Sequence, residues 1–545
     1  MVGVEFDYIV VGAGSAGCVL AGRLAAAAPR VSVLLIEYGG RAVNPLLRIP
    51  KGFYYTLRGD RYLYRYQTRP VTPGGADEVW LRGRVLGGSA AVNGMMWMRG
   101  ARADWDGLAA RGNRGWSWAD VLPAYRAMEN HSLGPSQLRG AGGPVGVTVA
   151  DSGDPVTAAV LAAAVGYGWD HVDDANASDA ERIAFTPSTI SGGRRVTSYD
   201  AYVRPALGPA LGPGRRPGGR NLAVATRTRV GRLLFDGRRC RGVRVTDRGG
   251  SARDITARRE VIVCAGTVET PLLLERSGIG RPDLLRAAGV EPRIESPNVG
   301  ERVIEQRGVA LQVALRPDRV AASRLSTRAG QAAEALRYLR SGRGLLATAG
   351  YDLVCQFKSA PDRPRPDVQG LFAPMALDTA SADLKLARHP GILFMAYPIR
   401  PQTSGTVHIS GADPADPPVI APRFLESAAD RAAVAPVLAT AREVLASSPV
   451  ADLIAGEEFP GPAVSTPDQA VRYSLASGTG IYHAVGAAAM GADAADVTDP
   501  QLRVRGAEGL RVADASILPV QVSGNTGAPA MLVGYRAADL IINDI

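Results

Sequence analysis

The chain contains few cysteines for its length. Four occur among 545 residues, Cys18, Cys240, Cys264 and Cys355, and they are far apart, with no CxxC pair and no histidine nearby. This spacing argues against a disulfide framework and against a zinc site, and no other metal site is predicted. We therefore expect four small, buried thiols in a reducing compartment.

Long apolar runs and clustered positive charge are missing as well. No stretch approaches the roughly 18 to 20 apolar residues of a membrane span. Acidic residues at Glu5 and Asp7 lead straight into a strand, so no signal peptide is predicted. The net charge of +10 comes mainly from scattered arginines, without a basic stripe interleaved with aromatic residues. Nucleic acid is therefore not an expected partner. We predict a cytoplasmic, two-domain protein, and the sequence does not predict its oligomeric state.

The first 40 residues carry a nucleotide-binding pattern. An apolar, β-branched run at 8–11 leads into the six residues GAGSAG at 12–17, an Ala- and Leu-rich helix, and a second apolar strand that ends at Glu37. The glycines permit a tight turn, close approach of a pyrophosphate and close helix–strand packing. The helix N-terminus favours phosphate, and a carboxylate about 20 residues further on suits a ribose hydroxyl. The pattern predicts a bound dinucleotide. Its place at the very start of the chain favours FAD over NAD.

Four later segments, in order, resemble signatures of the glucose–methanol–choline (GMC) family of FAD-dependent oxidoreductases. They are RGRVLGGSAAVNGMMWMRG at 82–100, AGTVETPLLLERSGIG at 265–280, YHAVGAAAMG at 482–491 and GLRVADASILPVQVSGNTGAPAMLVGYRAADLI at 509–541. With the N-terminal glycines they are spread, in the expected order, across essentially the whole chain. The resemblance implies an α/β protein with a Rossmann-type FAD-binding domain and an interleaved α+β substrate-binding domain.

The resemblance also implies that both domains are discontinuous. We expect the FAD-binding domain to comprise residues 1–44, 81–109, 220–300 and 481–545, and the substrate-binding domain to comprise 45–80, 110–219 and 301–480. Within the first domain, the residues around Gly237 predict a hairpin. A final helix is predicted over about 528–541, with Thr526 as its N-cap.

In the family, the segment at 82–100 runs along the flavin, which accounts for its many small residues. A larger side chain at Gly87 or Gly88 would occupy cofactor volume. Val92 stands where some members carry a histidine bonded covalently to the flavin, so FAD is expected to be held non-covalently. The residues that the resemblance places against FAD are Gly12, Gly14, Ser15, Ala16, Gly17, Glu37, Arg84, Val85, Gly87, Gly88, Asn93, Gly94, Met95, Val230, Ala265, Gly266, Asp514, Ala515, Asn525 and Thr526.

Oxidation of an alcohol requires a base for the hydroxyl proton as hydride leaves the carbon. Histidine can stay neutral and basic near pH 7. His483 occupies the family's catalytic position and Asn525 the partner position. The resemblance therefore implies His483 as the base, Asn525 as the amide that orients the substrate oxygen, and hydride transfer to nitrogen 5 of the flavin. The expected substrate is a primary or secondary alcohol, and the final electron acceptor is oxygen or another compound.

Several positions depart from the family pattern. An acid–histidine pair is replaced by Glu305-Gln306, an SRG turn by Thr403-Ser404-Gly405, GTCRMG by GAAAMG at 486–491, and EAG by Glu37-Tyr38-Gly39. We expect none of these to touch the base, and we expect them to change substrate preference towards a specialised compound. Two other reactions of this fold stay open. One is cyanohydrin cleavage by a lyase, which also uses a histidine base, and the other is light-driven decarboxylation of fatty acids, which requires a carboxylate-binding arginine near the flavin.

Overall fold

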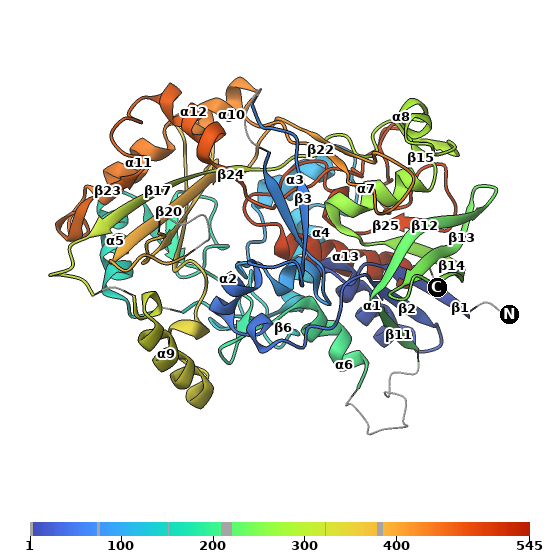
Figure 1. Cartoon of the computed structure of the whole chain (residues 1–545), viewed down its shortest axis with the longest axis horizontal. Coiled ribbons are helices and arrows are strands. Elements are labelled where there is room, and N and C mark those ends of the chain that lie inside the picture. Colours follow the sequence, from blue (N-terminus) through green and yellow to red (C-terminus); the bar gives the residue numbers. More distant parts are fainter. Residues whose placement is uncertain are drawn as a thin grey trace.

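The computed structural model describes residues 4–72, 77–150, 152–208, 221–321, 323–378 and 385–544. Two large sheets lie on opposite sides of the molecule (Figure 1). The first contains β1 and the chain's N-terminal strand–helix–strand unit, and the second contains β17 and β20. The short hairpin of β3 (Leu63–Gln67) and β4 (Val79–Gly83) lies between them.

The first sheet is mixed, in the order β11–β2–β1–β14–β13–β12, with β25 beside the end of β14. β11, β2, β1, β14 and β25 are parallel, and β13 pairs antiparallel with both β14 and β12. β2 is buried throughout, as expected of a parallel strand covered on both faces. The strands of the first sheet are β1 (Val4–Val11), β2 (Val33–Glu37), β11 (Leu222–Thr226), β12 (Thr228–Asp236), β13 (Arg239–Asp247), β14 (Ala252–Val263) and β25 (Leu510–Val512).

Local patterns account for much of this sheet. The predicted hairpin around Gly237 is confirmed, because β12 ends at Asp236 and β13 begins at Arg239.

The predicted final helix is also confirmed, as α13 (Gly527–Asn543). Thr526 precedes it but makes no side-chain capping bond. α13 packs closely along α1 (Ser15–Ala27), since a Cβ on Gly534 would lie 2.2 Å from the carbonyl oxygen of Ala16.

The second sheet has the order β23–β17–β20–β19–β18–β8–β7 and is antiparallel except for the β7–β8 pair. Apolar side chains on one of its faces form a core with α5 (Pro155–Tyr167) and α11 (Val437–Leu445). Its strands are β7 (Asp170–His171), β8 (Arg182–Phe185), β17 (Arg307–Leu315), β18 (Leu353–Phe357), β19 (Val368–Ala373), β20 (Gly391–Pro398), β23 (Ile454–Phe459) and, paired with the start of β17, β24 (Thr479–Gly480).

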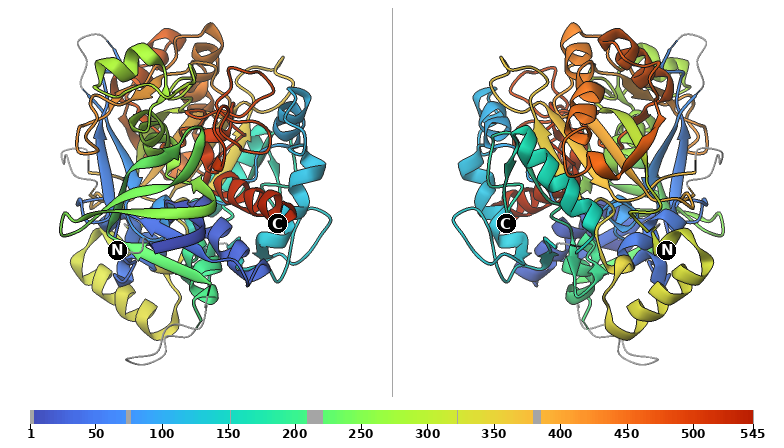
Figure 2. Two further views of the ribbon diagram at one scale, coloured as in Figure 1. Left: turned by 90° about the vertical axis from the view of Figure 1, so that its right-hand side faces the viewer. Right: turned by 90° about the vertical axis from the view of Figure 1, so that its left-hand side faces the viewer.

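The remaining elements surround these sheets, and α9 lies at one edge of the molecule, apart from both (Figure 2). The other helices are α2 (Phe53–Thr56), α3 (Arg102–Ala110), α4 (Trp118–Met128), α6 (Arg204–Ala206), α7 (Gly266–Arg276), α8 (Pro282–Ala287), α9 (Arg328–Ser341), α10 (Ala428–Val434) and α12 (Pro467–Ser477). The short strand pairs are β5 (Glu129–His131) with β6 (Val145–Val147), β9 (Ile190–Ser191) with β10 (Arg194–Arg195), β15 (Ile279–Gly280) with β16 (Ile294–Glu295), and β21 (Thr406–His408) with β22 (Val419–Ala421).

All four cysteines are buried and unpaired, which confirms them as small interior residues. Within the described ranges, no helix has both the length and the apolar content to cross a membrane.

Candidate active site

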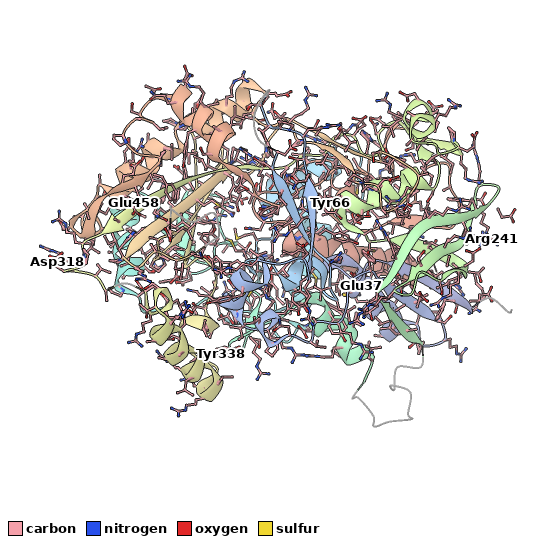
Figure 3. All side chains as sticks on the ribbon, viewed as in Figure 1. Glu37, Tyr66, Arg241, Asp318, Tyr338 and Glu458 are labelled. Atoms are coloured by element: carbon pink, nitrogen blue, oxygen red, sulfur yellow. The ribbon has the colours of Figure 1, made fainter. Side chains whose placement is uncertain are left out.

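A cavity of about 630 Å³ lies between the two sheets and is lined by residues of both. Glu37 and Tyr66, both on its wall, lie toward the middle of the molecule (Figure 3). The first sheet contributes the turn after β1, the end of β2 and part of β12. The second sheet contributes side chains of β19 and β20. The N-terminus of α13, the loop after β25 and residues 481–484, which follow β24, also line the cavity.

Bare backbone forms one end of this cavity. Gly12 has a φ of +103°, and a Cβ there would lie 2.3 Å from the carbonyl oxygen of Cys264. A Cβ on Gly88 would lie 2.6 Å from the Cα of Gly14, so two glycine segments meet without side chains. Gly14 itself faces open space, and the N-terminus of α1 has no side-chain cap. Unpaired N–H groups beside an open glycine surface fit the pyrophosphate of a dinucleotide such as FAD.

Glu37 joins this glycine surface to the end of β2. Its Oε2 accepts from the Ala13 N–H at 3.1 Å, and its Oε1 accepts from the Gly39 N–H at 2.7 Å. Burial raises the pKa of Glu37 to about 7. Each carboxylate oxygen has a second lone pair, so the side chain can still accept from a ribose hydroxyl.

Most residues predicted to touch FAD line the cavity. These are Gly12, Gly14, Ser15, Ala16, Glu37, Gly88, Asn93, Gly94, Met95, Val230, Ala265, Gly266, Asp514, Ala515, Asn525 and Thr526. Asp514 also holds the wall together, because its carboxylate accepts from the Gly266 N–H at 2.8 Å and the Thr270 hydroxyl at 2.6 Å.

Four of the predicted contacts lie behind the wall instead. A Cβ on Gly17 would lie 1.9 Å from the Gly12 carbonyl oxygen, so this glycine serves helix–strand packing. Val85 is fully buried in a small apolar cluster. Arg84 lies over the rings of Tyr38 and Tyr64 and donates to the Asp60 carbonyl oxygen at 2.7 Å. Gly87, with a φ of +95°, donates to the Ala13 carbonyl oxygen at 2.8 Å.

Asn93 is held by a residue that the sequence analysis missed. Arg195 is buried and donates to the Asn93 Oδ1 at 2.9 Å and to the Ala90 carbonyl oxygen at 3.0 Å. The Met95 N–H also donates to the Asn93 Oδ1, at 3.0 Å. The Asn93 Nδ2 lies 3.7 Å from the position of a Cβ on Gly527, so the amide nitrogen points toward the start of α13.

His483 and Asn525 meet on the cavity wall. The His483 Nε2 lies 3.1 Å from the Asn525 Nδ2, and the His483 Nδ1 lies 2.7 Å from the Gln306 Oε1. A carbonyl oxygen can only accept, so Gln306 places the ring proton on Nδ1 and leaves Nε2 with a lone pair. Burial, and then the nearby positive charge of Arg82, lower the pKa of His483 to about 3. The ring is therefore neutral and can accept a proton at Nε2.

The expectation that none of the family departures touches the base was wrong. Gln306 bonds the ring, and Glu305 accepts from the N–H groups of His483 and Ala484 at 2.8 and 3.0 Å. The cause is strand pairing, because β24 pairs with the start of β17 and a bridge joins Ile304 to Val485. This pairing brings residues 305–306 beside His483.

The wall contributed by the second sheet and its neighbours is apolar. Leu371, Leu393 and Met395 face the cavity from β19 and β20. The rest of this wall consists of further apolar side chains and of aromatic ones. The apolar side chains are Leu57, Met375 and Leu377, and the aromatic ones are Phe53, Tyr54, Tyr351 and Tyr397. The charged residues that line the cavity within the described part of the chain all lie elsewhere, on β2, β4, β12, α7 and the loop after β25, and are Glu37, Arg82, Arg229, Glu269, Arg276 and Asp514.

Comparisons with known proteins agree over the full length. Two family models described as GMC oxidoreductase match residues 6–306 and 401–534. An uncharacterised GMC-type oxidoreductase of Mycobacterium tuberculosis is 36% identical, covering 98% of this chain and 99% of the relative. Mitochondrial choline dehydrogenase of Homo sapiens is 34% identical, covering 98% and 90%. The crystal structure of pyridoxine 4-oxidase from Mesorbium loti is 28% identical, with a TM-score of 0.84 and 98% of each chain covered.

Proposed function

The chain belongs to the GMC oxidoreductase family, and we propose that it oxidises an uncharged, largely apolar primary or secondary alcohol to the aldehyde or ketone. FAD is the cofactor of this family and, when bound, supplies the acceptor for the two electrons and the carbinol hydrogen. The observation that carries the proposal is the neutral His483, whose unprotonated Nε2 meets the Asn525 amide in a cavity continuous with the glycine surface. Oxygen or another compound then removes the electrons.

We assign separate tasks to the two residues. The Asn525 Nδ2 donates to the His483 Nε2 at 3.1 Å, and a substrate hydroxyl that enters can replace this bond and contact both atoms. Asn525 donates to the hydroxyl oxygen and fixes its position, and His483 takes the hydroxyl proton at Nε2. The ring, held by Gln306 and placed by the two backbone bonds to Glu305, keeps its orientation during this transfer.

The composition of the wall supports an uncharged substrate. The side chains that β19 and β20 turn into the cavity are apolar or phenolic, and Arg82 is the charge that acts on His483. The acid that binds the His483 backbone, Glu305, is paired with Arg82 at 3.5 Å and does not line the cavity, so it does not favour a quaternary ammonium alcohol such as choline, the substrate in the name of one relative. Nothing charged on this wall, within the described residues, favours a carboxylate substrate either. Apolar side chains instead stabilise an alkyl or aryl body.

Anaerobic spectra of the purified flavoprotein test this proposal. Benzyl alcohol and 1-hexanol are expected to bleach the flavin absorbance, and choline at the same concentration is expected to act at least about tenfold more slowly, a difference of about 1.4 kcal/mol. Pyridoxine serves as a polar aromatic alcohol of similar size. Fast recovery of colour in air indicates oxygen as the acceptor. Bleaching by choline alone would refute the proposal of an uncharged substrate and would indicate that the aromatic side chains hold an ammonium group. If no alcohol bleaches the flavin, the proposed alcohol oxidation is refuted.

The depressed pKa of His483 predicts the pH dependence. A histidine with the ordinary pKa of about 6.5 is only about 3% neutral at pH 5. With a pKa of about 3, His483 is neutral throughout this range, because its protonated form gains population only as the pH approaches 3. We expect kcat/KM for the active alcohol to show no acidic limb between pH 5 and pH 8. A tenfold fall per pH unit below about 6.5 would contradict the assignment.

We also propose that FAD is held non-covalently. Val92 lines the cavity, and its side chain offers no nucleophile. Acid precipitation is expected to release yellow flavin into the supernatant, and a pellet that stays yellow would contradict this expectation. The division into an FAD-binding domain (1–44, 81–109, 220–300 and 481–545) and a substrate-binding domain stays a proposal, as does a cytoplasmic location.

A further inference from the structure

We propose that Arg182, a buried residue of β8, is a positioning residue that determines which ring nitrogen of His483 carries the proton. It does so through a directed chain of hydrogen bonds across the second sheet. The inference rests on the proposed function, in which His483 is the base, and it adds a residue that does not touch the cavity.

Arg182 is fixed as a donor at the far end of this chain. Its Nε donates to the Ala175 carbonyl oxygen at 2.7 Å, and its Nη1 donates to the Ala180 carbonyl oxygen at 2.8 Å. Its Nη2 donates to the Gln356 Oε1 at 2.6 Å. A guanidinium has five N–H donors and no acceptor, so Gln356 has to present its oxygen to Arg182. The amide nitrogen of Gln356 then points the other way.

The chain continues in one direction to the base. The Gln356 Nε2 donates to the Gln369 Oε1 at 2.9 Å, and the Gln369 Nε2 donates to the Asn525 Oδ1 at 3.0 Å. The Asn525 Nδ2 faces the His483 Nε2 at 3.1 Å. Each amide accepts at its oxygen and donates at its nitrogen, so the direction set at Arg182 reaches the ring. It leaves Nε2 as an acceptor.

Strand pairing places the first three members side by side. Gln356 on β18 lies directly opposite Arg182 on β8 and directly opposite Gln369 on β19. All three side chains are buried, and buried polar groups need partners. Gln369 also donates to the Tyr397 hydroxyl at 2.6 Å, and the ring of Tyr397 packs edge-on against His483. The amides are therefore held in place as well as ordered.

Without a fixed donor at one end, the same side chains could form the same hydrogen bonds with every donor and acceptor exchanged. If all the amides rotate by 180°, Gln306 donates to Nδ1, and the ring proton lies on Nε2 and points at the Asn525 oxygen. Each bond between these amides and the ring survives, but the base has no lone pair on the cavity side. This reversed chain places the Gln356 NH₂ against the Arg182 guanidinium. Arg182 therefore excludes it.

Gln356→Glu separates this proposal from a purely structural role. A carboxylate beside Arg182 pairs with it at no loss of volume, so a structural role predicts a stable, active variant. A carboxylate cannot donate, however, so Gln369 has to turn its NH₂ toward residue 356 and the chain beyond it reverses. We expect the proton to move to Nε2 and alcohol-driven flavin reduction to fall by about 10²-fold or more, within the range of general base catalysis. Arg182→Lys is the control, because its ammonium is also a donor only.

The measurement is the tautomer of His483 in the FAD-bound protein, from long-range ¹H–¹⁵N spectra of the histidine-labelled chain, with the signal assigned by its loss in His483→Gln. The proposal requires Nδ1–H in the wild type and in Arg182→Lys, and Nε2–H in Gln356→Glu. A proton on Nε2 in the wild type would overturn the proposal, and this result does not depend on whether any variant folds. A folded Gln356→Glu variant with the same tautomer as the wild type would also overturn it. The tautomer needs no substrate. If the tautomers are as expected but no alcohol reduces the flavin, the result therefore contradicts the proposed function and leaves the role of Arg182 in place.

Discussion

His483→Ala is expected to stop alcohol-driven reduction of the bound flavin while FAD stays in place. In the proposed reaction the ring accepts the hydroxyl proton, and general base catalysis contributes about 10²–10⁴-fold. The substitution removes the bonds to Gln306 and Asn525 but leaves the glycine surface at Gly12 and Gly14 untouched. The rate of flavin bleaching after anaerobic mixing with benzyl alcohol or 1-hexanol measures the effect, and the visible spectrum before mixing reports the bound FAD.

His171→Ala is the matched control for this experiment. His171 lies on β7, at the outer edge of the second sheet, and is exposed. Its removal is expected to leave the bleaching rate within about twofold, because exposed side chains away from the site contribute little to stability. Equal rates for the wild type and His483→Ala would reject His483 as the base.

Gly12→Ala and Gly14→Ala are expected to lose FAD for different reasons. At Gly12 the φ of +103° strains any larger residue, by about 1–2 kcal/mol, and the new Cβ would lie 2.3 Å from the Cys264 carbonyl oxygen. The protein itself is therefore destabilised, and its melting temperature falls by at least about 1–2 °C. At Gly14 the φ of −82° suits alanine, and the Cβ meets nothing within 4 Å. We expect a normal fold with an FAD affinity lower by at least about tenfold, equivalent to about 1.4 kcal/mol.

Two measurements distinguish these outcomes. Thermal melts of the flavin-free proteins report the fold, and titration with FAD, followed by flavin fluorescence, reports the cofactor site. Gly14→Ala should match the wild type in the first and differ in the second. If Gly14→Ala binds FAD as tightly as the wild type, the pyrophosphate does not lie against this glycine.

Short-range patterns were enough to predict the cofactor end of the molecule. The glycines at 12–17 and the strands on either side of them lie within one stretch of chain, and the hairpin around Gly237 is equally local. The same holds for α13, whose start follows Thr526. Spacing determines structure in each case, because the partners are neighbours in sequence as well as in space.

The contacts that support His483 could not be predicted in this way. Gln306 is 177 residues from His483 along the chain, and Gln369 is 156 residues from Asn525. These contacts depend on the pairing of β17 with β24 and on the position of β19, which local patterns do not encode. A weaker signal was present, since Gln356 and Gln369 interrupt otherwise apolar strands. A polar side chain in such a strand requires a hydrogen-bonding partner.

The apolar wall has a consequence for how this enzyme can diverge. Leu371, Leu393 and Met395 project from strands held together by backbone bonds, and those bonds do not depend on which side chain is present. The glycine surface and the base belong to other segments of the chain. Mutations can therefore enlarge, narrow or reshape the space for a substrate while the reaction chemistry is inherited unchanged, so a gene copy can acquire a new substrate without first losing the old catalyst.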